Sequence, residues 1–334
     1  MMRTAIRVAM SCLVVAAACS PALAREIDKS FHETFDVSKG VVLSLDYGDG
    51  DVTITPWDQD VIDVVVRYRA DVKTIGFGTE PDFDVEFRQT DNRVTVRGIE
   101  STTSGVYIFY SMNEDDYTYT IKAPSYVTLD LQGDDGDMVL SGWRADIECR
   151  VDDGDVKFSD VVNGNTEIWI EDGDIRLSEL FGDLVVRGDD GDIAITSSTL
   201  THALFAVEDG DIRISDSEGN FDATVDDGDV TLTRVTASVV DVRSEDGSVN
   251  LDVTSDADIH LNVTTDDGDV TIRLGKGLSF QYLVTMDDGR VDIDLDGATE
   301  TESHEHRMSG RVGTGGGLVR VSTADGSVEL SIAE

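Results

Sequence analysis

The chain has 334 residues, with 68 Asp and Glu against 26 Lys and Arg, and its formal net charge at pH 7 is −42. A surface of this kind repels phosphate backbones and anionic lipids, because proteins bind both through patches of Lys and Arg. The composition therefore argues against nucleic acid as a partner and leaves cations, basic proteins and neutral glycans.

Residues 1–24 indicate a secretory signal peptide. Arg3 and Arg7 come first, the apolar run "VAMSCLVVAAAC" follows, and the small residues of "SPALA" suit signal peptidase. Lipoprotein-type cleavage before Cys19 is an alternative, although the large aliphatic residue usual three places before such a cysteine is missing. No later stretch approaches the roughly 18 apolar residues of a membrane-spanning helix. We expect an exported protein of the periplasm or cell surface, without a transmembrane segment after signal removal.

Residues 25–125 form an N-terminal β region that we expect to cap the rest of the chain. The segments "VIDVVVRYRADV", "DFDVEFRQTDNRVTVRG" and "SGVYIFYSMNEDDYTYTIKAP" alternate like long strands and are rich in aromatic residues. A repetitive stack needs its open end covered, which favours a cap. The same aromatics suit binding of a glycan or a peptide. The candidates are Tyr107, Phe109, Tyr110, Tyr117 and Tyr119.

Residues 126–334 are dominated by one repeated unit. The glycine of an Asp-Gly pair marks each copy, and successive markers from residue 136 to residue 247 are alternately 18 and 19 residues apart. Repetition at a nearly fixed period indicates one supersecondary unit stacked on its own copies. Residues 296–317, "DGATETESHEHRMSGRVGTGGG", interrupt the last interval and are predicted to be an exposed loop insertion.

Each unit reads as a strand, an acidic turn, a second strand and a second turn. Segments such as "DVKFS", "DIRLS" and "DIAIT" alternate polar and apolar residues after the marker, and the residues before it alternate too. Asp-Gly between strands also suits a hairpin, so an antiparallel meander or propeller is an alternative. The steady unit length favours coils stacked in register. We expect an all-β fold, a right-handed parallel β-solenoid resembling a β-helix, with 18–19-residue repeats.

Acidic residues concentrate around the marker glycine. Glycine and aspartate are the residues that a recurring tight turn needs. Stacked carboxylates repel one another, so each must be offset by N–H bonds, by screening or by a bound cation such as calcium, which takes oxygen ligands. Calcium is the one cofactor that the pattern suggests. The candidate ladder comprises Asp153, Asp155, Asp172, Asp174, Asp190, Asp192, Asp209, Asp211, Asp227 and Asp229.

Three elements of the sequence resemble a known family. They are the opening "FDVSKGVVLSLDYGDGDVTITPWDQDVIDVVV", the bridge "YTIKAPSYVTLDLQGDDGDM" and the recurrent "DGDVxLS" units. Together they resemble the bacterial putative-adhesin family, a domain of unknown function built of β-strand repeats, over most of residues 30–334. The resemblance implies a secreted or envelope-bound β-solenoid without a defined catalytic site.

The functional expectation follows from repetition. Almost every clustered carboxylate is one copy of a repeat, whereas a catalytic group would have to stand apart from the scaffold. We expect a non-enzymatic, adhesin-like or structural protein whose repeated surface makes multivalent contacts with an envelope or surface protein or a glycan. One alternative is a calcium-binding acidic β-roll. The other is a carbohydrate-active β-helix enzyme, because large parallel β-helices include polysaccharide lyases and hydrolases.

Overall fold

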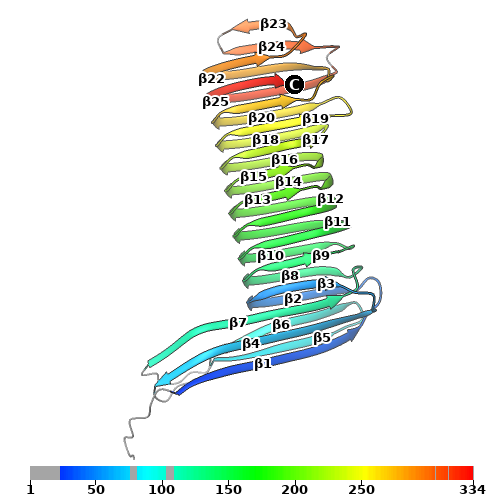
Figure 1. The fold of residues 1–334 in the computed structure, drawn as a ribbon, viewed down its shortest axis with the longest axis vertical. Helices are drawn as coiled ribbons and strands as arrows, with labels where there is room; N and C mark the ends of the chain where they lie inside the picture. The colour runs from blue at the N-terminus through cyan, green and yellow to red at the C-terminus, as the bar shows by residue number, and fades with distance from the viewer. Residues whose placement is uncertain (1–22, 76–80, 103–108, 305, 315, 334) are drawn as a thin grey trace, which may run out of the picture.

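The computed structural model describes residues 23–75, 81–102, 109–304, 306–314 and 316–333. These residues form 25 strands joined in one continuous sheet, and no helix occurs among them. The strands lie one above another along the long axis, with the N-terminal strands at one end and the C-terminal strands at the other (Figure 1). The prediction of an all-β, solenoid-like fold is confirmed.

Strands of the stack pair in parallel with their equivalents in the neighbouring coils. Each coil has a stretch of strand before the Asp-Gly turn and another after it, and β11 and β12 each run unbroken from the turn of one coil to the turn of the next. In chain order they are β2 (Val42–Asp49), β3 (Asp51–Pro56), β8 (Thr128–Asp135), β9 (Met138–Ser141), β10 (Ile147–Asp153), β11 (Val156–Asp172), β12 (Ile175–Asp190), β13 (Ile193–Thr196), β14 (Thr199–Asp209), β15 (Ile212–Ser215), β16 (Glu218–Asp227), β17 (Val230–Thr236), β18 (Val239–Asp246), β19 (Val249–Thr254), β20 (His260–Asp267) and β21 (Val270–Leu274).

In the parallel register, each residue of a coil pairs with the residue at the same repeat position of the next coil. Phe158 pairs with Leu177, and Leu177 pairs with Ile195. All three side chains are buried, while the intervening Lys157 is exposed. Burying one such side chain stabilises the fold by about 1.5–3 kcal/mol. A slip of one residue would turn every inward side chain outward, so the steady spacing of the units keeps one core continuous along the stack.

The N-terminal end of the core is closed by antiparallel strands that continue both walls of the first coil. One wall extends from β3 through β7 (Phe109–Ala123) and β4 (Val61–Ile75) to β1 (Leu23–Asp36); the other extends from β2 through β6 (Arg93–Thr102) to β5 (Pro81–Gln89). Phe83 meets Phe31 and Tyr68 across the walls, with ring centroids 5.7 and 5.4 Å apart. Residues 42–56, inside the predicted N-terminal region, are the first coil of the stack.

The C-terminal end departs from chain order. After β21 the chain forms β22 (Phe280–Asp294), but β25 (Gly317–Ile332) lies between the two layers, pairing in parallel with β20 and β21 on one side and with β22 on the other. The loop predicted at 296–317 is corrected here. It contains β23 (Thr299–His304) and β24 (Arg307–Val312), which form an antiparallel hairpin. The hairpin forms because β24 pairs with an edge of β22 that β25 leaves free.

Candidate functional site

Every coil changes direction at an Asp-Gly pair, and the backbone requires glycine there. Gly173 and Gly191 have φ angles of +139° and +133°, which side chains rarely tolerate. A Cβ on Gly191 would lie 2.0 Å from the carbonyl oxygen of Gly173. The glycines therefore stack backbone on backbone, and this close stacking aligns the aspartates on either side of them.

The aspartate after each glycine bonds to the next coil. Asp155 Oδ1 accepts the backbone N–H of Asp174 at 3.0 Å, and Asp174 Oδ1 accepts the N–H of Asp192 at 3.1 Å. Asp192 accepts in the same way from Asp211, and Asp211 from Asp229. Each carboxylate thus satisfies a main-chain donor at the corner of the next coil. We call these residues the aspartate ladder: Asp155, Asp174, Asp192, Asp211 and Asp229.

Two arginines engage the second carboxylate oxygen of four of the five ladder aspartates. Arg176 donates to Asp155 at 2.6 Å and to Asp174 at 2.5 Å. Arg213 donates to Asp192 at 2.7 Å and also pairs with Asp211. The backbone N–H of the following coil, helped by the arginine, holds the pKa of Asp155 and of Asp192 below the usual range, although partial burial opposes the shift. Asp155 and Asp192 are therefore ionised and bound to donors at neutral pH.

The aspartate before each glycine lies on the outside of the turn. These residues are exposed and stack in register from coil to coil. Loss of solvation and the charges of Asp172 and Asp135 raise the pKa of Asp153, and loss of solvation together with Asp172 raises that of Asp190. Like charges therefore repel one another along this edge. We call it the outer column: Asp153, Asp172, Asp190, Asp209 and Asp227.

The calcium hypothesis covered both sets of aspartates. Across the part of the chain that the structure describes, no group of three or more His, Cys, Asp or Glu side chains is placed to hold a metal ion. Calcium takes six to eight oxygen ligands, whereas the ladder already spends an oxygen of each carboxylate on a backbone donor. The geometry gives the ladder a structural task, and calcium binding at these turns stays a prediction.

The aromatic candidates of the N-terminal region separate into two groups. Tyr117 and Tyr119 are only 7% and 0% exposed, and their ring centroids lie 4.8 and 5.2 Å from those of two further tyrosines of the core. These two rings close the core and offer no surface to a ligand. Phe109 and Tyr110 belong to β7, but their side chains lie outside the described part, as does the whole of Tyr107.

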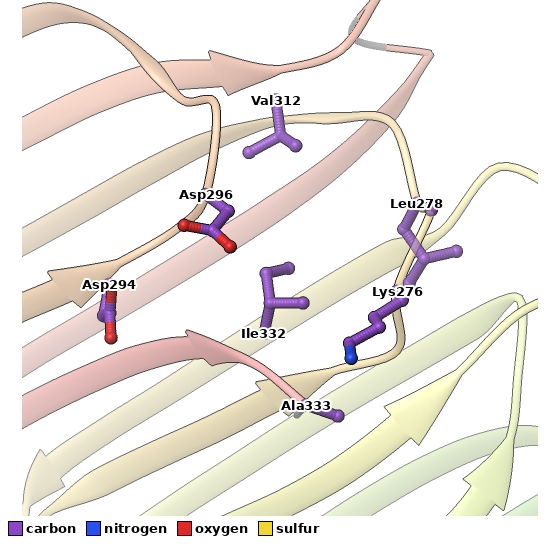
Figure 2. Close-up of a pocket in the computed structure, with 8 residues that line it drawn as sticks. Lys276, Leu278, Asp294, Asp296, Val312, Ile332 and Ala333 are labelled. Atoms are coloured by element: carbon purple, nitrogen blue, oxygen red, sulfur yellow. The ribbon is translucent and has the colours of Figure 1, made fainter.

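A cavity of about 570 Å³ lies at the C-terminal end, where β25 ends below β22. It is lined by Lys276, Gly277, Leu278, Asp294, Asp296, Val312, Ile332 and Ala333. Figure 2 shows Ile332 in the middle, with the two aspartates on one side and Lys276 on the other. All three charged residues are exposed to solvent.

Sequence reasoning missed one outward tryptophan. Trp169 lies half-buried on the outer face of β11, and the guanidinium carbons of Arg150 and Arg187 lie 4.2 and 5.5 Å from its ring centroid. A signal existed in the repeat itself. The equivalent positions of two nearby coils hold Gln132 and Ala206, so a large aromatic is out of pattern there.

Solved structures with similarity to this chain include three from two bacterial species. A putative adhesin from Parabacteroides distasonis is 11% identical over 90% of this chain and 96% of that chain, with a TM-score of 0.40. A putative lipid binding protein from the same species is 10% identical over 91% and 97%, with a TM-score of 0.39. A putative adhesin from Bacteroides fragilis is 12% identical over 90% and 96%, with a TM-score of 0.31.

No curated protein matches the chain. Within the described residues, no helix has the length and apolar character needed to cross a membrane.

The family comparison covers the coils and the turns described above. The model of Toastrack DUF4097 matches residues 42–260 and again residues 181–331. The matches begin at β2, the first coil, and end within β25. They agree with the resemblance to adhesin-like domains of unknown function. The chain therefore belongs to the Toastrack DUF4097 family.

Proposed function

We propose that this protein is a non-enzymatic, adhesin-like structural module of the cell envelope that acts through multivalent surface contacts. The observation that supports this best is the parallel register, in which each outward side chain lies beside its equivalent in the next coil. Such neighbours are roughly 4.8 Å apart. A surface protein or glycan with its own repeating structure would meet similar chemistry on successive coils, and weak contacts would add.

Other parts of the proposal concern location and winding. The signal-like residues 1–24 support export to the periplasm or cell surface. We propose a right-handed coil, because parallel crossover connections are right-handed in nearly all proteins. A repeat of 18–19 residues is supported by the ladder bonds, which join residues 18 or 19 positions apart.

The non-enzymatic part of the proposal rests on how the carboxylates are used. Ladder aspartates bond to main-chain N–H groups and arginines, and the outer column repeats one environment along the stack. An acid–base pair would need two carboxylates whose surroundings set them apart from these copies. A carbohydrate-active enzyme is the rival, and turnover of acidic or neutral polysaccharides by the purified chain would establish it.

The test exploits the register. Deleting residues 212–248 joins Asp211 to Val249, which occupies the repeat position of Ile212, so the stack should close with two coils fewer. Beads coated with either protein at equal density are mixed with isolated bacterial envelopes and counted by flow cytometry. Multivalent contact predicts that the shortened protein folds and adheres several-fold more weakly. Equal adhesion of the two proteins, or no adhesion by the complete chain, would contradict the proposal.

A further inference from the structure

We propose that Trp169, with Arg150 and Arg187, forms a binding site for a short stretch of neutral glycan on the outer face of β10, β11 and β12. The site would give the proposed contact function a ligand class at one place on the stack. It does not require that function, because a glycan could bind here in a protein that is no adhesin.

The three side chains come from consecutive coils and lie in register. Arg150 pairs with Trp169, and Trp169 pairs with Arg187, so all three project from the same outward column. Arg150 stacks on the indole at 4.2 Å and is held by Glu148 at 2.6 Å. Arg187 is farther from the ring, at 5.5 Å, and pairs with Glu167 at 3.2 Å. Each guanidinium is thus positioned by a carboxylate, and the indole is covered less closely on the side of Arg187.

Apolar groups extend the site toward the next coils. Val185 and Leu204 follow Glu167 in the adjacent outward column, and Leu204 is 39% exposed. Farther along the same column the residue is Asp222. In this column the apolar residues are therefore confined to the first and second coils beyond that of the tryptophan. In a stack whose outward positions are mostly polar, this local departure from the repeat has no role in the core.

The polar groups around the ring suit hydroxyls rather than ions. A hollow of about 260 Å³ is lined by Trp169, by both arginines and by three acids from the turn side, Asp152, Glu171 and Asp189. Guanidiniums only donate and carboxylates only accept, whereas a sugar hydroxyl does both. An anion would meet three carboxylates. A cation would compete with the two guanidiniums already near the ring. A neutral sugar ring can place its apolar face against the part of the indole that Arg187, at 5.5 Å, covers less closely, and its hydroxyls on both kinds of charge.

The experiment measures binding of the purified chain to immobilised cellohexaose, N-acetylchitohexaose and mannohexaose, with hexalysine and heparin as charged probes. The main variant is Trp169→Gln, because glutamine is the residue that an earlier coil carries at the same position, Gln132, and the stack should tolerate it. Arg187→Ala tests the second component of the site. Arg243→Ala, in the same outward column several coils away, is the matched control.

We expect saturable binding to at least one neutral hexasaccharide, a loss of about tenfold or more in affinity for Trp169→Gln, and a smaller loss for Arg187→Ala. Arg243→Ala should bind like the unchanged chain. The inference is overturned if no neutral probe binds, if hexalysine or heparin binds more tightly than every neutral probe, or if Trp169→Gln binds as well as the unchanged chain. Each of these results leaves the bead assay of the shortened stack to be judged separately, because the deletion of 212–248 retains Trp169 and Leu204.

Discussion

Replacement of Asp192 by alanine tests whether the ladder joins the coils. Asp192 accepts the backbone N–H of Asp211 at 3.0 Å and pairs with Arg213 at 2.7 Å. A hydrogen bond to a charged group contributes about 1.5–3 kcal/mol, and an exposed ion pair about 0–1 kcal/mol. The carboxylate is 47% exposed, which places both contributions toward the lower end. We expect Asp192→Ala to lower the free energy of unfolding by about 1–2 kcal/mol.

Two further variants separate the hydrogen bond from the charge. Asp192→Asn keeps an oxygen acceptor for the N–H of Asp211 and should lose less than the alanine variant. Asp189→Ala removes an exposed acid of the same turn from outside the ladder and should change stability by less than about 0.5 kcal/mol. Urea unfolding followed by circular dichroism gives the midpoints, with an unchanged slope as the check on two-state behaviour. The reasoning is refuted if Asp192→Ala is as stable as Asp189→Ala.

Three other predictions concern the Asp-Gly turn, the pH dependence of stability, and the layer formed by β25. Gly191→Ala should lower the free energy of unfolding by at least about 2 kcal/mol in the same urea assay, because the φ of Gly191 is positive and a Cβ there would meet the Gly173 carbonyl. Gly277→Ala, at positive φ with open space around it, should lower the free energy of unfolding clearly less. Equal losses in the two variants would contradict the stacking argument. The free energy of unfolding should rise as pH falls toward the ordinary aspartate pKa of about 4, because the raised pKa values of Asp153 and Asp190 let the folded chain bind those protons first. Below about pH 4 the free energy of unfolding should drop, because the lowered pKa values of Asp155 and Asp192 make the unfolded chain bind more protons there. A steady decline from pH 7 in urea titrations would be the opposite result. Removal of residues 317–334 should expose the edges of β20, β21 and β22, because β25 pairs with all three strands. Residues 275–316 should then become sensitive to limited proteolysis. Unchanged resistance to the protease would show that β22 docks on the stack without β25.

The stack was predictable because its signal is repeated. Alternation around residues such as Phe158, Leu177 and Ile195 identified inward positions, and the steady spacing favoured parallel register over an antiparallel meander or propeller. The C-terminal order was not predictable in the same way. Residues 317–332 carry the same unit as the coils before them, and local pattern does not determine which layer a strand enters. The short strands at 299–312 also lack strong alternation, because much of the hairpin is exposed.

The candidate sites were harder to predict than the fold. The repeat pattern showed that the aspartates recur at the turns. Whether a carboxylate binds a cation or accepts a backbone N–H depends on how far one coil is shifted relative to the next, which the sequence does not give. Asp155 meets the N–H of Asp174 because the parallel register places that donor beside it. Tyr117 and Tyr119 looked available because their strand is rich in polar residues, yet its alternation turns both rings into the core. Trp169 could have been found by comparing outward positions of the repeat one column at a time.

The most direct measurement is a crystal structure of the chain without residues 1–24, grown after chelation and then soaked in millimolar calcium. If the aspartates join the coils, the Oδ1 of each ladder residue will lie about 3 Å from the backbone nitrogen of the next coil both before and after the soak. The contradicting result is an ordered calcium ion bound between ladder aspartates of successive coils, with those backbone bonds broken.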